Sequence, residues 1–189
     1  WLDQVTELTQ FLQKHANTPY VGIDTEFIRE RTYYPQLALV QICINDEIAL
    51  IDPAIPEIAK LLQPLLSNPS ILKIMHSSSE DLQAFKAGCD VVPTPIFDTQ
   101  VAASICGLGS SLSYLKIVEQ ICGVTLSKGE TRSDWLKRPL TESQMHYAAD
   151  DVRYLLPIYH HLSEALEQLN RTEWLVSDCQ FAVESAQHD

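Results

Sequence analysis

The order of hydrophobic and polar residues predicts helices and strands in alternation along the chain. LDQVTELTQFLQ has apolar residues at helical spacing and predicts an amphipathic helix. Strands are expected at residues 19–27, QLALVQICI, EIALIDP, ILKIMH and within VVPTPIFDTQ. The turn-prone residues Asn45 and Asp46 separate the second and third of these strands, which predicts a hairpin. Strands in the first half and helices afterwards predict an α/β domain with a mixed sheet.

Two of the predicted helices have defined starts. Ser77 and Glu80 have the spacing of a capping box, so a helix with Ser77 as N-cap is expected directly after ILKIMH. Thr141 and Gln144 predict a second capping box, and behind it an apolar stripe continues to position 166 with a kink expected at Pro157. Helices are also expected at residues 55–66, DTQVAASIC and SSLSYLKIVEQIC.

An acidic pair at the end of the first strand points to a metal site. In YVGIDTEF the strand period of two places Asp24 and Glu26 on the same side. Two neighbouring carboxylates are tolerated there mainly when a cation or a shared proton compensates their charge, and a hard divalent ion suits oxygen ligands. The pair alone also fits a turn or the ribose-binding acid of a dinucleotide-binding domain. Gly107 and Gly109, however, lack the third glycine of that motif.

Three residues on predicted helices extend this pair. Asp81 falls in the first turn of the helix after ILKIMH, where an acid faces the positive end of the helix. Tyr147 and Asp151 are four residues apart and lie on one helix face, whereas Asp150 sits about 100° away round the axis. Each residue alone fits a helix-dipole or packing role. The combination predicts a two-metal nuclease.

Composition and charge limit the function classes. With 189 residues, 46% hydrophobic and 20% charged, the chain is expected to form one globular domain. The net charge of −12 argues against a broadly basic nucleic-acid surface, although two divalent ions would neutralise the acidic site. A short segment gathers basic and aromatic residues, namely Lys128, Arg132, Trp135, Lys137 and Arg138. This segment fits either contacts with a nucleic-acid strand or solvated loop charges.

Two further sequence features concern the compartment. No apolar run approaches the ~20 residues of a membrane span, and the first residues lack the layout of a signal peptide. A cytoplasmic protein without membrane contact is therefore expected. The five cysteines form no CxxC pair and are expected to be reduced thiols.

The motifs together resemble the DEDD superfamily of 3′-to-5′ exonucleases in its tyrosine branch, and within it most closely the ribonuclease D family. The matching motifs are Asp24-Thr25-Glu26, Asp81 in HSSSEDL, and Tyr147 to Asp151 as Tyr-x-x-x-Asp. Further similar stretches are TYYPQLALVQI, FDTQVAA and KGETRSDWLKRPLT. The resemblance implies an α/β, ribonuclease H-like fold, with a mixed five-stranded sheet flanked by helices and an exonuclease domain over residues 1–170. Residues 171–189 are then a terminal helix or the start of a linker to C-terminal helical domains that this chain lacks.

The resemblance also implies an activity. Two Mg²⁺ or Mn²⁺ ions would be held by Asp24, Glu26, Asp81 and Asp151, with Tyr147 orienting the attacking water. The main chain at Thr25 and Phe27 would accept the terminal nucleotide. Apart from the resemblance, the basic and aromatic character of Lys128, Arg132 and Trp135 predicts that they contact the incoming strand. The expected reaction is hydrolysis at RNA 3′ ends, in tRNA precursors above all, with release of nucleoside 5′-monophosphates. A DNA exonuclease of the same superfamily and a non-catalytic nucleic-acid-binding module are the alternatives.

Overall fold

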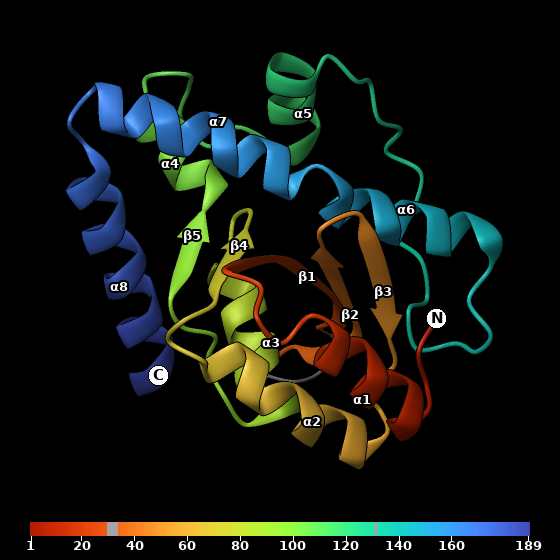
Figure 1. The fold of residues 1–189 in the computed structure, drawn as a ribbon. Helices are drawn as coiled ribbons and strands as arrows, with labels where there is room; N and C mark the ends of the chain where they lie inside the picture. Colours follow the sequence, from red (N-terminus) through yellow and green to blue (C-terminus); the bar gives the residue numbers. More distant parts are fainter. Residues whose placement is uncertain (30–33, 131) are drawn as a thin grey trace.

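The structure is a computed structural model that describes residues 1–29, 34–130 and 132–189 (Figure 1). The strands are β1 (Tyr20–Ile28), β2 (Gln36–Ile44), β3 (Glu47–Ile51), β4 (Leu72–Met75) and β5 (Ile96–Asp98). The helices are α1 (Val5–Lys14), α2 (Pro56–Ser67), α3 (Ser79–Cys89), α4 (Thr99–Ile105), α5 (Tyr114–Cys122), α6 (Glu142–Arg153), α7 (Leu155–Gln168) and α8 (Thr172–His188). Positions 32, 33 and 131, which belong to TYYPQLALVQI and KGETRSDWLKRPLT, lie outside the described residues.

The five strands form one mixed sheet in the order β3-β2-β1-β4-β5, which confirms the predicted fold class. β1, β2 and β3 pair antiparallel, and the predicted β2–β3 hairpin turns at Asn45, whose φ of 55° an asparagine tolerates. β1, β4 and β5 pair parallel through helical crossovers. β1 is therefore the central strand, and its acidic residues lie in the middle of the sheet.

Helices cover both faces of this sheet (Figure 1). α6 and α7 pack across β1 and its neighbours on one face, with α4 and α5 against α7, while α3 packs on the opposite face and contacts α2. β1 and α7 approach closely at Gly22, where an added Cβ would lie 3.2 Å from the Leu155 Cβ. Because side chains alternate along β1, Asp24 and Glu26 face α6 on the same side as Gly22, and Thr25 faces α3.

The predicted capping box at Ser77 is wrong. Ser77 adopts a φ of 56°, and the N-cap of α3 is Ser78, which makes no side-chain capping hydrogen bond. The reason is the buried Asp98 at the end of β5. Its carboxylate accepts hydrogen bonds from the backbone N–H of Ser77 (3.0 Å) and from the N–H and hydroxyl of Ser78 (both 2.8 Å). The same carboxylate caps α4, so one side chain ties β5 and α4 to the start of α3.

We expect Asp98→Ala to lower the free energy of unfolding by about 3 kcal/mol, because it orphans several buried N–H groups at once. Urea unfolding of the metal-free protein measures this loss. Asp98→Asn, which keeps one acceptor oxygen, is the matched variant and should lose less. A loss below about 1 kcal/mol in Asp98→Ala would contradict this role.

The predicted long helix is two helices, α6 and α7, divided at Tyr154. Pro157 has no N–H to donate to the carbonyl of Arg153, four residues earlier, and so the regular helical ladder ends at that residue. At the break, the backbone N–H of Tyr154 donates a hydrogen bond to the hydroxyl of Tyr114 at 3.3 Å. The break therefore lies three residues before the expected kink, while the capping box of Thr141 and Gln144 is confirmed.

The stretch after Arg171 is the helix α8, which lies beside the edge strand β5 (Figure 1). Leu175, Cys179 and Val183 form its buried side. Trp174 and Phe181 are exposed on the same helix.

Candidate metal centre

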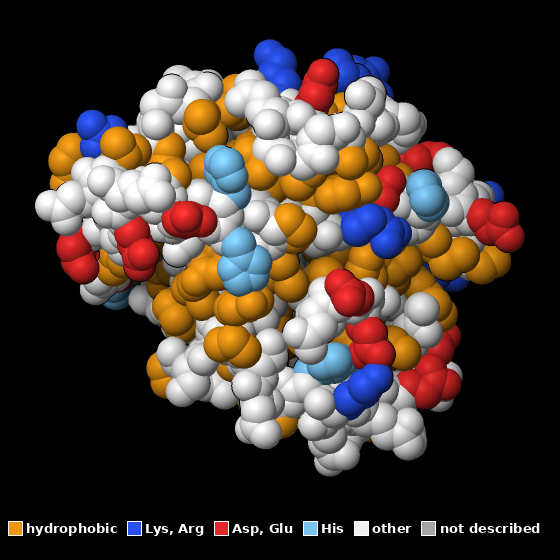
Figure 2. Space-filling model, turned by 45° about the horizontal axis from the view of Figure 1, so that its top comes forward, with side chains coloured by type: hydrophobic (Ala, Val, Ile, Leu, Met, Phe, Trp, Pro, Cys, Tyr) orange, Lys and Arg blue, Asp and Glu red, His pale blue; other side chains and the backbone are white. Residues whose placement is uncertain are grey.

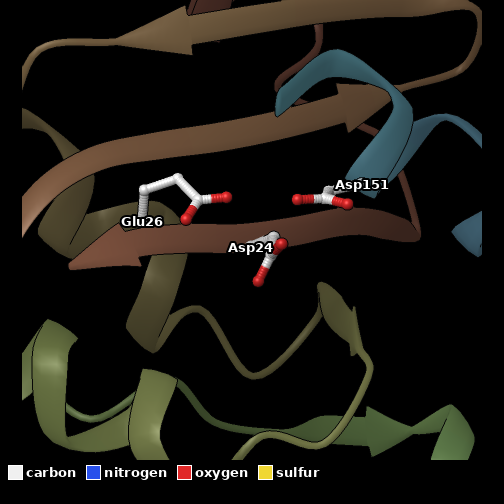
Figure 3. A group of neighbouring side chains, drawn as sticks. All are labelled: Asp24, Glu26 and Asp151. Atoms are coloured by element: carbon white, nitrogen blue, oxygen red, sulfur yellow. The ribbon is translucent and has the colours of Figure 1, made fainter. Parts of the chain in front are cut away.

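Three carboxylates from two elements converge above the middle of the sheet (Figure 3). Asp24 and Glu26 come from β1, and Asp151 comes from α6, which crosses that strand. One carboxylate oxygen from each of the three lies within 4.8 Å of the other two. This spacing lets one cation contact all three residues. The neighbouring Asp150 accepts a hydrogen bond from Arg153 at 3.0 Å instead, so Asp151 is the acid of this helix that joins the cluster.

Asp81 approaches the cluster from the first turn of α3 and is buried. Its carboxylate accepts a hydrogen bond from the hydroxyl of Thr25, the β1 residue between the two acids. Its carboxyl group also lies within hydrogen-bonding reach of that of Asp24, as the carboxyl group of Asp151 does of that of Glu26. Two carboxyl groups can hydrogen-bond only through a shared proton. The four acids therefore form two pairs, each suited to hold a proton or a cation.

The pKa values of all four acids lie above their ordinary range. Removal from water is the largest cause in each case, and it raises the pKa of Asp81 and of Asp151 to about 7. For Glu26, burial and the negative charge of Asp151 raise the pKa to about 9. For Asp24, burial and the charges of Asp81 and Asp151 raise it well above 3.8.

This electrostatic arrangement fits divalent metal binding. Among the described residues, no Lys or Arg forms a salt bridge with any of the four acids. Within that part of the chain, Lys and Arg therefore do not compensate the mutual repulsion of the acids, and a divalent cation can replace the shared protons. The donor set consists of carboxylate oxygens alone, which suits Mg²⁺ or Mn²⁺ rather than softer metals.

Tyr147 lies half-buried on α6, one turn before Asp151. Burial, followed by the negative charges of Asp151 and Glu26, raises the pKa of its phenol above the ordinary value of 10.0. The hydroxyl is therefore protonated at neutral pH and can donate a hydrogen bond. This state suits a group that orients a water molecule better than one that removes its proton.

Trp135 corrects one expectation. Its indole is only 3% exposed and packs with Leu39, Leu140 and Ala148, so it offers no surface for stacking on a nucleic-acid base. The ring contacts Tyr147 instead, with centroids 6.0 Å apart. Trp135 is a packing residue beneath the tyrosine.

Arg138 fixes this loop to the sheet. Its guanidinium donates to the carbonyls of Trp135 (2.6 Å) and Ala38 (2.8 Å) and to the carboxylate of Asp52 (3.0 Å). Ala38 is the residue skipped where the β1–β2 register shifts, between Glu26 and Phe27. The sequence groups Arg138 with the exposed loop charges, but in the structure it is an anchor.

Of the remaining predicted substrate residues, Thr25 is buried, Phe27 is half-buried, and Lys128 and Arg132 are exposed. Phe27 and Arg132 line one groove of about 940 Å³ at the end of β1. Lys128 is exposed on the same loop. On the face drawn in Figure 2, Lys and Arg side chains are interspersed with Asp and Glu, without one continuous basic patch. Attraction for a polyanion would therefore be local, in keeping with the net charge of −12.

Gln41 lies beside the acidic cluster and is not among the residues that the sequence interpretation selected. It interrupts a run of buried apolar residues on β2 and is itself fully buried. A glutamine inside an otherwise apolar strand was the available signal. That Asp24 is its cross-strand partner follows only from the register of β1 and β2.

No helix in the described part of the chain is both long enough and apolar enough to cross a lipid bilayer.

Comparison with known proteins agrees with the geometry. Residues 1–167 match the family described as 3′-5′ exonuclease. Ribonuclease D of Xanthomonas oryzae is 51% identical over 189 residues, which are 100% of this chain and 52% of that protein. The chain thus spans about half the length of the ribonuclease D relatives that it matches.

Solved structures show the same likeness. The crystal structure of Escherichia coli RNase D, described as an exoribonuclease involved in structured RNA processing, superposes with a TM-score of 0.91 at 38% identity, covering 99% of this chain and 50% of that one. Brucella melitensis NrnC with bound Mg²⁺ gives a TM-score of 0.83 at 28% identity, covering 94% and 88%. The same protein has also been solved bound to pGG. With its five-stranded sheet and its converging acids, the chain belongs to the 3′-5′ exonuclease family of the DEDD superfamily, with bacterial ribonuclease D among its relatives.

Proposed function

We propose that this chain carries the catalytic site of a metal-dependent 3′-to-5′ exoribonuclease that releases nucleoside 5′-monophosphates from RNA 3′ ends. The observation that supports it most is the convergence of Asp24, Glu26 and Asp151, with Asp81 beside them. The ribonuclease D relatives support RNA as the substrate class. Because the chain spans about half of those proteins, substrate affinity and tRNA precursors as the preferred RNA are part of the proposal.

The four acids would hold two divalent ions, Mg²⁺ or Mn²⁺. When bound, such ions supply positive charge for the attacking water and for the departing 3′ oxygen. Tyr147 would donate a hydrogen bond that fixes the orientation of the water. The main chain at Thr25 and Phe27 would receive the terminal nucleotide, with the Phe27 ring in the adjoining groove. Lys128 and Arg132 would contact phosphates further along the strand.

Two alternatives keep the fold and change the function. A 3′-5′ DNA exonuclease would use the same acids, and a non-catalytic module would bind nucleic acid without cleaving it. Incubation of 3′-labelled and 5′-labelled RNA and DNA oligonucleotides with the protein, with Mg²⁺ or Mn²⁺ and with chelator, separates all three. We expect stepwise 3′ shortening of RNA that stops with chelator. Preferential shortening of DNA would favour the first alternative, and binding without cleavage by folded, metal-loaded protein would favour the second.

We expect Tyr147→Phe to lower kcat by about 10²-fold while KM for RNA changes little, because the hydroxyl orients the nucleophile rather than the substrate chain. Steady-state cleavage of a labelled RNA oligonucleotide measures both constants. Tyr159→Phe on α7, whose ring packs against Phe97 and Tyr20, is the matched control and should cleave like the wild type. Equal turnover in both variants would remove Tyr147 from the mechanism.

Lys128→Ala combined with Arg132→Ala should weaken RNA binding and flatten its salt dependence. For a single strand, every phosphate that a protein cation no longer neutralises reduces the slope of log K against log salt by about 0.7, so a reduction of about 1.4 is expected. Fluorescence anisotropy of a single-stranded RNA at several salt concentrations measures the slope. Lys14→Ala with Lys60→Ala on α1 and α2 removes the same charge elsewhere and should leave the slope nearly unchanged. An unchanged slope in the first variant would show that this loop does not contact phosphates.

A further inference from the structure

We propose that Gln41 is a positioning residue of the metal centre, whose amide fixes Glu26 relative to α6. This inference deepens the proposed function and rests on it. Gln41 is 0% exposed and is the polar residue in a run of eight buried positions on β2, from Leu37 to Ile44. Burial of a primary amide among apolar side chains is costly unless its hydrogen bonds are made.

Strand register places Gln41 at the cluster. It pairs directly with Asp24 across the antiparallel β1–β2 ladder, and cross-strand partners point to the same face of a sheet. That face carries Glu26 as well and is covered by α6. The amide therefore lies between the strand that supplies two of the acids and the helix that supplies the third.

The amide nitrogen of Gln41 joins these two elements. It donates to the carbonyl of Ala148 on α6 at 3.4 Å, and it hydrogen-bonds the Glu26 carboxylate, which lowers the pKa of that acid against the effect of burial. Ala148 lies between Tyr147 and Asp151 in sequence. The carbonyl of Ala148 can only accept, so the NH₂ group of Gln41, rather than its oxygen, faces α6. A single donor group thus connects Glu26 to the helix turn that carries Tyr147 and Asp151.

The oxygen of the same amide argues against a purely structural role. Within the described residues, Oε1 of Gln41 is buried and has no hydrogen-bond partner. An unsatisfied buried acceptor costs about 1–3 kcal/mol, and an apolar side chain of similar shape would avoid this cost. A residue selected only to hold the sheet against α6 would be better served by methionine or leucine. The contact with Glu26 gives a physical reason for an amide at this position.

If Gln41 positions Glu26, its replacement should have opposite effects on the stability of the metal-free protein and on its affinity for metal. In Gln41→Met the buried acceptor disappears, so the Tm of the metal-free protein should stay the same or rise. Glu26 loses the donor that orients it, and the affinity for Mn²⁺ should fall by about tenfold or more. Turnover should require correspondingly more Mn²⁺, with KM for RNA at saturating metal nearly unchanged.

The test measures Mn²⁺ binding to metal-free protein by calorimetry, together with thermal unfolding, for the wild type, Gln41→Met and Gln41→Asn. The asparagine keeps the amide but is too short to reach both acceptors, and its Mn²⁺ affinity should also fall. Cys43→Ala, two residues further along the same face of β2, is the control; its Mn²⁺ affinity should equal that of the wild type.

The outcomes are distinct. Wild-type affinity for Mn²⁺ in both Gln41 variants would overturn the inference and leave the proposed function intact. Loss of folding, or a large drop in Tm, in metal-free Gln41→Met would show that the fold itself needs the amide and would also overturn it. Absence of Mn²⁺ binding in the wild type would count against the metal centre and the proposed function themselves.

Discussion

Asp24→Asn should reduce metal-dependent cleavage by at least about 10³-fold, or ~4 kcal/mol of transition-state stabilisation. Asp24 is the acid that neighbours all the others, since the charges of Asp81, Asp151 and Glu26 each raise its pKa. Its replacement removes a carboxylate ligand from the centre of the cluster while keeping its shape. The loss should appear in kcat at every Mg²⁺ or Mn²⁺ concentration.

The same substitution should stabilise the metal-free protein, and this separates a site effect from misfolding. A neutral amide removes a carboxylate that is ionised only at a cost in this environment, so at pH 8 the Tm should rise by about 2–6 °C. Asp46→Asn, in the exposed β2–β3 turn, makes the identical charge change away from the cluster and should retain wild-type cleavage. Substantial cleavage by Asp24→Asn, at more than a tenth of the wild-type rate, would sink the proposed mechanism.

The sequence is sufficient to predict that these acids lie together, because their spacings are local. A strand period of two is sufficient to place Asp24 and Glu26 on one side, and a helical turn places Tyr147 beside Asp151. The choice of Asp151 over Asp150 follows from the same helical geometry, and the structure brings Asp151 to the cluster. Helix α6 spans both residues without a break, so the local rule holds there.

Interactions between distant segments account for what the sequence did not show. Ser77 and Glu80 have the spacing of a capping box, but Asp98, about twenty residues later, accepts the backbone N–H of Ser77 that the Glu80 side chain would accept in such a box. Tertiary hydrogen bonding thus overrides a correct local pattern. Trp135 likewise lies among basic residues in the sequence, as an aromatic residue that contacts nucleic acid would. In the fold its side chain is buried, and Arg138 donates a hydrogen bond to its carbonyl.

Gln41 shows a third limit of prediction from the sequence, which is the register in which strands pair. A polar residue inside an apolar strand is visible in the sequence, but a slip of one position would turn it to the opposite face. Only the pairing of Gln41 with Asp24, fixed by the hairpin and by the register shift after Glu26, brings its amide to the cluster. Sequence reasoning therefore selects the candidate ligands, and the structure is needed to find what holds them in place.

The stability of the metal-free protein should fall as pH rises from 5 to 9. The folded-state pKa values of the site acids are raised, to about 7 for Asp81 and Asp151 and about 9 for Glu26, from 3.8 and 4.5. At pH values between the unfolded-state and the folded-state pKa of an acid, the folded chain keeps a proton that the unfolded chain releases. The unfolded state therefore binds fewer protons, and the free energy of unfolding decreases with pH. A loss of several kcal/mol, measured as a lower Tm, is expected across this range.

Divalent metal should reverse this trend, because a cation replaces the shared protons and binds more tightly as they leave. Thermal unfolding at pH 5, 7 and 9, with chelator and with saturating Mn²⁺, tests both halves of the prediction. The increase in Tm caused by Mn²⁺ should grow from pH 5 to pH 9. Asp46→Asn should follow the wild type, whereas Asp24→Asn should show a shallower pH dependence and a smaller metal effect. A metal-free Tm that stays constant or rises over this range would show that the four acids do not store protons in the folded state, and the two-pair arrangement would then be wrong.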